Sequence, residues 1–229
     1  MCRRYAAPPP CASRPVVSCL THQGGGDMTE SDAAPRALSA RRRQILEAAI
    51  TVLAGQGWRG LTHRAIDRAA GLPEGSSSAY YRSRSALQTA MADFVVGQLA
   101  TDVEALAAEL EECPGDHDRA VAATTATFRR WLDESDLLTA RLELTLAAAR
   151  DDDLAAQLRD SREGLTSIVG DILARGGHPR TDAVSGTIVA AVDGVLISAL
   201  LRPPAHRARF VADSLDLLLG SLVEGRPAE

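Results

Sequence analysis

The stretch Leu61–Leu87, LTHRAIDRAAGLPEGSSSAYYRSRSAL, decides the fold. A short helical pattern begins after Thr62, a good N-cap, and ends at Gly71, which suits the left-handed residue after a helix. A second short helix is expected to begin near Pro73, because proline is tolerated in a first helical turn. Two short helices joined by a turn are typical of a helix-turn-helix, whose second helix enters a DNA groove. The stretch therefore predicts DNA binding.

The second of these helices has an unusual composition. Residues Gly75–Ala79 read GSSSA and have poor helix propensity. Such small side chains would let a backbone approach the wall of a groove closely. A flexible serine-rich loop is the alternative, but it does not explain why Tyr80 and Tyr81 are followed at once by another helical pattern.

A longer helix is expected to precede this unit, from Ser39 as N-cap to about Gln56. Apolar residues recur in it at helical spacing, which indicates a buried face. Arg41, Arg42 and Arg43 come before that face, either as a solubilising end or as a clamp on DNA phosphates. The expected buried residues are Ile45, Ala48, Ala49, Val52 and Leu53.

The remaining chain also shows helical patterns and no strand signals. A long helix is expected from Ser83 or Ser85 to about Glu112. Further helices are expected at roughly 117–133, 136–149, 151–175, 180–201 and 205–223, separated by glycine and proline. The fold class is therefore all-α. We expect a disordered tail at 1–35, a three-helix helix-turn-helix head at 36–84, and a helical domain at 85–229.

Charge divides the 229-residue chain in the same way. Residues 36–84 hold nine arginines and three acids, for a net charge of +6, whereas residues 85–229 hold 13 arginines and 24 acids, for −11. A basic module on an acidic body indicates a polyanionic partner at one end only, although a solvated charged surface is the alternative.

The cysteines, the apolar runs and the N-terminal segment indicate the environment in which the protein works. Cys2, Cys11 and Cys19 lie in the irregular tail at spacings that match no zinc site, so we expect a reduced, cytoplasmic protein without metal or cofactor. No apolar run reaches the roughly 18 residues of a membrane span, so no membrane partner is expected. Met28 begins a more usual protein start, and we hypothesise that the preceding 27 residues are an over-extended translation start.

Two other classes of function are weighed against DNA binding. An enzyme would need a Ser-His-Asp, His-x-x-x-His, phosphate-loop or paired-carboxylate arrangement, and none is visible at a meaningful spacing. An all-helical scaffold or adaptor without a DNA role would share the composition but would have no need for the helix-turn-helix at Leu61–Leu87.

Residues Arg41 to about Met91 resemble the TetR family of bacterial transcription regulators. The resemblance is carried by RRRQILEAAI, by the glycine-rich loop before Leu61-Thr62, and by AAGLPEGSSSAYYRSRSAL. It implies a homodimer, in which each head inserts its third helix into a major groove of a palindromic double-stranded DNA operator. It also implies a repressor that releases DNA when a small-molecule effector binds among the later helices, which resemble the family only in layout.

The resemblance also implies roles for individual residues of the head. Arg64 matches a base-reading position, where arginine can grip guanine O6 and N7. Arg84 matches a basic phosphate contact, and Tyr81 matches a buried aromatic. Glu74 departs from the family's usual Lys or Gln, so we expect it to accept from a cytosine amino group or to pair with a nearby arginine. The expected DNA-contact residues are Arg41, Arg42, Thr62, His63, Arg64, Glu74, Gly75, Ser76, Ser78, Ala79, Tyr80 and Arg84.

Polar and aromatic residues within the apolar later helices are candidates for a ligand pocket. The charged ones could instead pair with other helices or lie at an interface, and the aromatic ones could instead be core. Small residues in the helices near 180–201 and 205–223 suit close packing, and the resemblance suggests a four-helix dimer interface there, with a monomer core as the alternative. The ligand-pocket candidates are Phe94, Phe128, Trp131, Arg141, Glu143 and Asp193.

Overall fold

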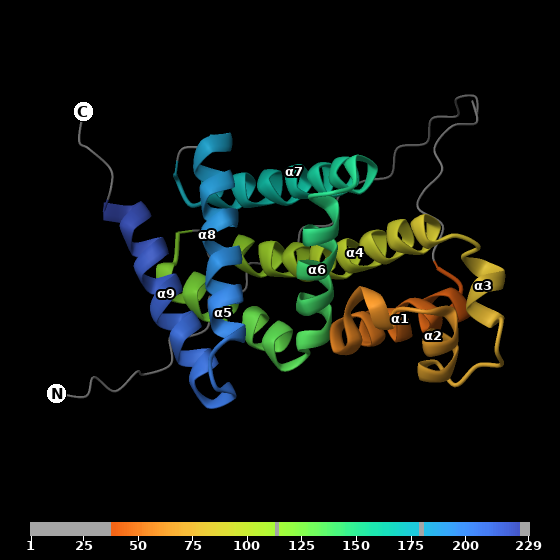
Figure 1. The fold of residues 1–229 in the computed structure, drawn as a ribbon. Helices are drawn as coiled ribbons and strands as arrows, with labels where there is room; N and C mark the ends of the chain where they lie inside the picture. The colour runs from red at the N-terminus through yellow and green to blue at the C-terminus, as the bar shows by residue number, and fades with distance from the viewer. Residues whose placement is uncertain (1–37, 113–114, 179–180, 225–229) are drawn as a thin grey trace, which may run out of the picture. The chain divides into compact units, whose positions relative to one another are not determined.

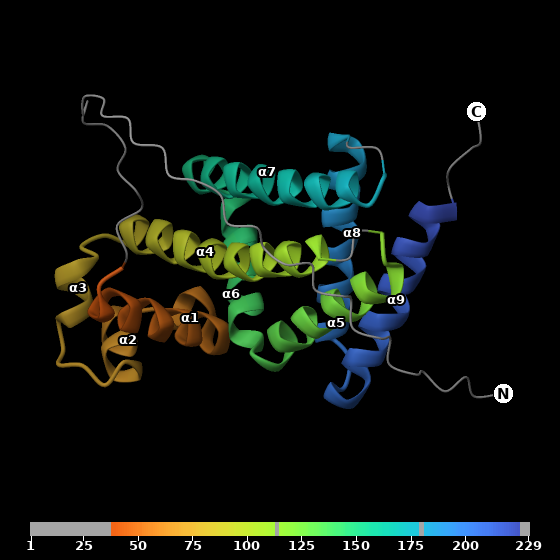
Figure 2. The same cartoon turned by 180° about the vertical axis from the view of Figure 1, so that it is seen from behind.

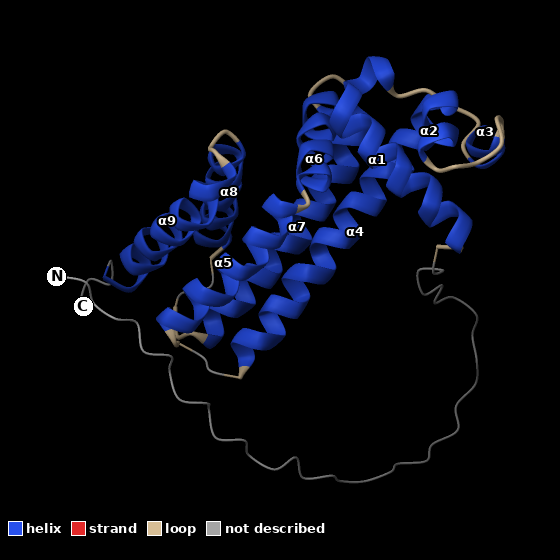
Figure 3. Cartoon of the chain, turned by 90° about the horizontal axis from the view of Figure 1, so that it is seen from below, coloured by secondary structure: helices blue, strands red, loops and turns tan. Residues whose placement is uncertain are grey.

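The computed structural model describes residues 38–112, 115–178 and 181–224, and every regular element among them is an α-helix (Figure 3). The all-α fold class is confirmed. The predictions for residues 1–35, including the disorder, the cysteines and the start at Met28, lie outside the described residues.

Three helices form the part of the chain that contains the helix-turn-helix: α1 (Ala40–Gly60), α2 (His63–Ala69) and α3 (Ser76–Tyr80). Ser39 caps α1 by accepting from the Arg42 N–H, and Thr62 caps α2 by accepting from the Ala65 N–H. Helical geometry in α1 breaks at Gly57, whose φ is 62°. Both predicted caps are therefore confirmed, and the glycine-rich segment ends α1 close to where the sequence indicates.

The start of the third helix was predicted wrongly. It begins at Ser76 and not near Pro73. Gly75 has φ 90° and ψ −7°, a left-handed conformation that interrupts helical geometry and that L side chains rarely adopt. Proline and Glu74 therefore form the turn before α3, which leaves the helix only five residues long.

In the described part of the chain, six helices follow (Figure 1): α4 (Arg84–Glu111), α5 (His117–Asp133), α6 (Ser135–Ala148), α7 (Asp152–Arg175), α8 (Asp182–Leu200) and α9 (Pro204–Glu224). Their bounds agree with the predicted ranges to within a few residues. Ser83 caps α4 and Asp151 caps α7 through their side-chain oxygens. Local signals in the sequence were therefore sufficient to find these helices.

Ser39–Glu229 form one compact unit. Within it α4 packs along α7, α5 packs against α9, and α1 packs against both α2 and α6 (Figure 2). The predicted buried face of α1 is confirmed, and so is the burial of Tyr81. Helix α1 packs on α2 and also on α6, which lies after residue 84 in the sequence. The parts of the chain before and after residue 84 are therefore in contact, and the expected domain boundary there remains a prediction about function.

Helix α8 differs from its sequence-based description. By length and composition it could cross a membrane, a property that apolar core helices share. Asp193, a charged residue within α8, does not remove that property. Large apolar side chains of α8 and of the segments beside it also remain exposed: Ile197, Leu201 and Leu217 are 43%, 86% and 75% exposed. These residues leave an apolar surface on α8 and α9.

Candidate functional site

A buried carboxylate fixes the short third helix. Asp67 on α2 is 1% exposed, and its two oxygens accept from the Gly75 N–H and the Ser77 N–H, each at 2.8 Å. Burial acts to raise the pKa of the Asp67 carboxyl, but the hydrogen bonds from Ser77 and Gly75 outweigh it, so the pKa lies below its usual value. The charged carboxylate therefore satisfies backbone donors at the start of α3 that a five-residue helix leaves without helical partners.

Ser77 completes this polar contact. It is fully buried, its hydroxyl lies 3.1 Å from His63 Nδ1, and it donates to the His63 carbonyl at 3.3 Å. The first residue of α2 and the second residue of α3 are thus joined by hydrogen bonds. His63 was an expected DNA-contact residue, and the structure places it half-buried, with its ring against Ser77 of α3.

Arg64 of α2 and Glu74 of the turn before α3 are both exposed to solvent. Arg64 Nε is 3.4 Å from Glu74 Oε1, and the side chains are 75% and 72% exposed. This is the arginine pairing that was one of the two expectations for Glu74. The ion pair itself adds little stability at such exposure. It does hold a guanidinium beside the N-terminus of α3, where both groups are accessible to a ligand.

Arg84 and Tyr80 are exposed near the end of α3. The Arg84 guanidinium lies over the Trp58 ring, 5.4 Å from its centroid, and Tyr80 is 42% exposed. At the start of α1, Arg41 and Arg42 are exposed, and Arg41 Nη1 donates to Gln44. The exposed or half-exposed members of the predicted DNA-contact set also include Thr62, Gly75, Ser76, Ser78 and Ala79.

A cavity of about 750 Å³ lies among α4, α5, α6, α7, α8 and α9. Its lining is largely aliphatic, with Phe128 and Trp131 stacked at a centroid distance of 5.3 Å along α5. Ligand pockets of proteins have volumes of roughly 300–1,000 Å³ and mostly apolar walls with a few polar groups. The cavity therefore has the dimensions of a site for a small organic molecule.

Two arginines of the cavity lining converge on Asp193 of α8. Arg141 Nη2 lies 2.8 Å from Asp193 Oδ1, and Arg162 Nη1 lies 2.7 Å from Asp193 Oδ2. The side chains of Arg141 and Asp193 are 26% and 21% exposed, whereas that of Arg162 is 44% exposed. One carboxylate is therefore shared by two guanidinium groups from α6 and α7.

The structure brings together four of the six predicted ligand residues. Phe128, Trp131, Arg141 and Asp193 line the cavity. Phe94 does not: it belongs to the buried core, where the Arg43 guanidinium lies 5.8 Å from its ring centroid. Glu143 does not line the cavity either, because it is two residues from Arg141 and points to another side of α6.

Glu143 has a different place in the structure. Its backbone carbonyl accepts a hydrogen bond from Trp58 Nε1 at 3.3 Å. Trp58 lies near the end of α1 and also carries the Arg84 guanidinium over its ring. Helix α6 thus contacts the cavity through Arg141 and contacts α1 through the Glu143 carbonyl.

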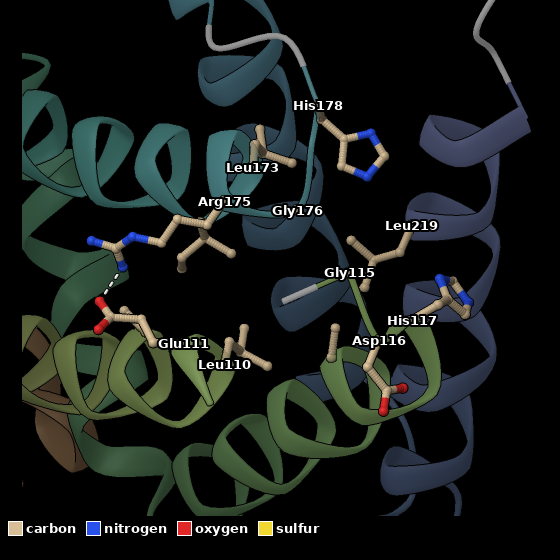
Figure 4. Close-up of a pocket in the computed structure, with 13 residues that line it drawn as sticks. Leu110, Glu111, Gly115, Asp116, His117, Leu173, Arg175, Gly176, His178 and Leu219 are labelled. Atoms are coloured by element: carbon tan, nitrogen blue, oxygen red, sulfur yellow. Dashed lines mark hydrogen bonds and ion pairs between the residues drawn. The ribbon is translucent and has the colours of Figure 1, made fainter. Parts of the chain in front are cut away.

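A second, smaller pocket of about 110 Å³ lies where α4, α5, α7 and α9 come together (Figure 4). Arg175 of α7 and Glu111 of α4 form an ion pair at its edge, and His117 Nε2 lies 3.1 Å from Asp216. The volume is too small for a drug-sized molecule. Among the described residues, no group of His, Cys, Asp and Glu is arranged to hold a metal ion.

Comparison with known proteins places this arrangement in a family. Residues 115–225 match the model of a tetracycline repressor-like C-terminal domain. This part of the chain is therefore similar to the C-terminal domain of the TetR family. The resemblance seen in the head is thereby confirmed by an independent part of the chain. No curated protein matches the sequence.

Solved structures, several of them of TetR-family proteins, are similar over most of this chain. A TetR-family member of Streptomyces coelicolor A3 is 27% identical with a TM-score of 0.60, over 79% of this chain and 98% of the other. The multidrug binding protein EbrR, solved with imidazole, is 26% identical with a TM-score of 0.55, over 79% and 95%. A TetR transcription regulator of Haloarcula marismortui is 14% identical with a TM-score of 0.65, over 81% and 99%. The TetR fold supports a DNA-binding transcriptional regulator.

Two residues of these sites were missed by sequence reasoning. Asp67 gave no local signal of its burial, because its partners Gly75 and Ser77 lie outside its own helix. Arg162 lies on a helix whose partner α8 is distant in sequence, so only the tertiary structure reveals its contact with Asp193.

Proposed function

We propose that this protein is a dimeric, cytoplasmic transcriptional repressor that binds a palindromic operator and releases it when a small molecule enters the cavity. The proposal is carried by one observation, the attachment of α3 to α2 through Asp67. That attachment fixes a short helix while Arg64, Glu74 and Tyr80 remain exposed around it. Residues 36–84 are then the DNA-binding domain, and residues 85–229 bind the effector and the second copy.

The DNA contacts divide by chemistry. Arg64 is the proposed base reader, since a guanidinium can donate two hydrogen bonds to guanine. Glu74 orients Arg64 through their ion pair, or accepts from a cytosine amino group once Arg64 turns to its base. Arg84 is the proposed phosphate contact at the end of α3. The further proposed contacts are Arg41, Arg42, Thr62, His63, Gly75, Ser76, Ser78, Ala79 and Tyr80.

Dimerisation is proposed through α8 and α9. The exposed apolar residues Ile197, Leu201 and Leu217 favour a protein partner over solvent. The small exposed residues Ala190 and Gly194 of α8 allow a second helix to approach closely. A four-helix interface with a second copy would bury these residues and would give the operator-binding unit two heads.

Effector response is proposed to pass through α6. Arg141 contacts Asp193 in the cavity, and the Glu143 carbonyl of the same helix accepts from Trp58 beside Arg84. A ligand that draws Arg141 away from Asp193 would shift α6 and with it α1. The solved complexes of EbrR with imidazole and with malachite green support a small molecule as the effector. No enzymatic activity is proposed.

A gel-shift experiment with the DNA that flanks the protein's own gene tests this function. The full chain should retard this DNA at low salt and at lower protein concentration than it needs for a random duplex of equal length. Higher salt should weaken both complexes, because phosphate contacts release counterions. Folded, dimeric protein that retards neither duplex would contradict the proposal and favour a scaffold or adaptor.

A further inference from the structure

We infer that the cavity takes an amphipathic anion, a molecule with an apolar body and one carboxylate or similar acidic group held by Arg141 and Arg162. This inference names the effector class and rests on the proposed function. It starts from the ion cluster on Asp193, whose composition is not fixed by the family resemblance.

The charges around the cavity favour an anion. Its lining contains three arginines, Arg141, Arg159 and Arg162, and two acids, Glu104 and Asp193. The lining therefore carries a net positive charge, although the body of the protein is acidic. A cationic ligand would have to enter against that excess, whereas an anion would be attracted by it.

The hydrogen-bond donors around Asp193 exceed its acceptors. Each carboxylate oxygen of Asp193 is engaged by one arginine, at 2.8 Å from Arg141 and 2.7 Å from Arg162. A guanidinium carries five N–H donors in a planar fork, so each arginine has donors beyond the one used on Asp193. A second carboxylate can accept from both forks, but an incoming ammonium would compete with two guanidiniums already in place.

The remaining lining of the cavity favours a ligand with an apolar body. Phe128 and Trp131 are stacked, and the one polar atom of the indole, Nε1, donates to Asp102 at 2.7 Å. Its N–H is therefore committed within the protein, and the aromatic pair offers the cavity mainly apolar surface. Burying an alkyl chain against this wall removes apolar surface from water and so stabilises the complex.

Three probes that share a decyl chain test the inference: decanoate, decan-1-ol and decylamine. Each is titrated into the full chain by isothermal titration calorimetry, below the concentration of micelle formation. Decanoate should bind at least tenfold more tightly than the alcohol and the amine. Arg162→Gln should remove that preference, and the exposure of Arg162 favours correct folding of this variant. Arg129→Gln on α5, whose exposed pair with Asp133 lies away from the cavity, is the matched control and should keep the preference.

A second variant should change the affinity for decanoate in the opposite direction. Asp193→Asn removes the competing carboxylate and should raise the affinity for decanoate while leaving that for decan-1-ol unchanged. Circular dichroism confirms folding of each variant.

Several results would overturn the inference: binding of none of the probes, tighter binding of decylamine than of decanoate, or an unchanged preference in Arg162→Gln. The gel shift without ligand separates the two proposals. Operator binding without decanoate binding overturns this inference alone, whereas decanoate binding without DNA binding overturns the proposed regulator.

Discussion

At the scale of single residues, the head depends on Asp67 and on Ser77. The hydroxyl of the buried Ser77 meets His63, and its N–H meets Asp67. The sequence did not indicate this contact, since Asp67 lies ten residues earlier on another helix.

We predict that Asp67→Asn destabilises the protein. An asparagine side chain offers one acceptor oxygen and one amide group, so either the Gly75 or the Ser77 N–H is left without a partner in a buried site. The expected loss is about 1–3 kcal/mol in the free energy of unfolding. Urea denaturation at pH 7 measures it, with the exposed substitution Glu47→Gln as control. Equal midpoints for wild type and Asp67→Asn would contradict this role.

The pH dependence of the stability of Asp67→Asn provides a second test of this role. The pKa of Asp67 is lowered by folding, so its stabilisation is present above the unfolded pKa and is lost as pH falls through the lower folded pKa. We therefore expect the stability difference between wild type and Asp67→Asn to shrink below about pH 4. A difference that grows on acidification would show the opposite sign.

Arg64 and Arg84 should differ in what they recognise. Arg64→Ala should weaken binding to the operator by roughly 1–3 kcal/mol more than binding to random DNA. Arg84→Ala should weaken both and should lower the log–log salt slope by about 0.9. Fluorescence anisotropy titrations at several salt concentrations measure both effects. Equal losses on both DNAs for Arg64→Ala would remove it from the base-reading residues.

At the scale of elements, the long helices were predictable and α3 was not. Side-chain caps at Ser39, Thr62, Ser83 and Asp151 define the starts of α1, α2, α4 and α7 locally. Helix α3 has neither a side-chain cap nor a long apolar face, and its start is set by the left-handed conformation of Gly75 and by Asp67 on another helix. Proline suggested an earlier start because it favours a first helical turn in general.

Gly75→Ala tests how strongly that conformation matters. The added methyl group would meet open space, so the expected cost arises from the positive φ alone, at about 1–2 kcal/mol. Because the strain falls at the start of α3, operator affinity should decrease. Gly97→Ala in α4, where the methyl group also meets open space and φ is ordinary, is the matched control for the anisotropy titration. Unchanged operator affinity for Gly75→Ala would show that α3 tolerates a shift of its start.

At the scale of the whole molecule, the sequence indicated an all-helical regulator but could not place the cavity. Phe128, Trp131, Arg141 and Asp193 come together from α5, α6 and α8, whereas Phe94 faces the core on the same helix as cavity residues. Helical periodicity predicts that a face is buried, but it does not distinguish burial in a core from burial around a cavity. That difference arises from packing among six helices.

The exposed apolar residues of α8 and α9 lead to a prediction about assembly. Leu201→Glu combined with Leu217→Glu should shift the protein from dimer to monomer, because two carboxylates per copy would lose hydration in the interface. Light scattering coupled to size exclusion measures the mass. Leu146→Glu on α6, also at an exposed leucine, is the control and should leave the mass unchanged. A dimeric double variant would place the interface elsewhere.

The claim that two heads read one operator is tested most directly by a hydroxyl-radical footprint of the full chain on the retarded DNA. The account predicts two protected segments related by a two-fold axis, with centres separated by one helical turn, about 10 bp, or a multiple of it. Arg64→Ala should weaken both segments equally, since each copy contributes the same side chain. A single protected segment, or protection that does not change in Arg64→Ala, would contradict the account.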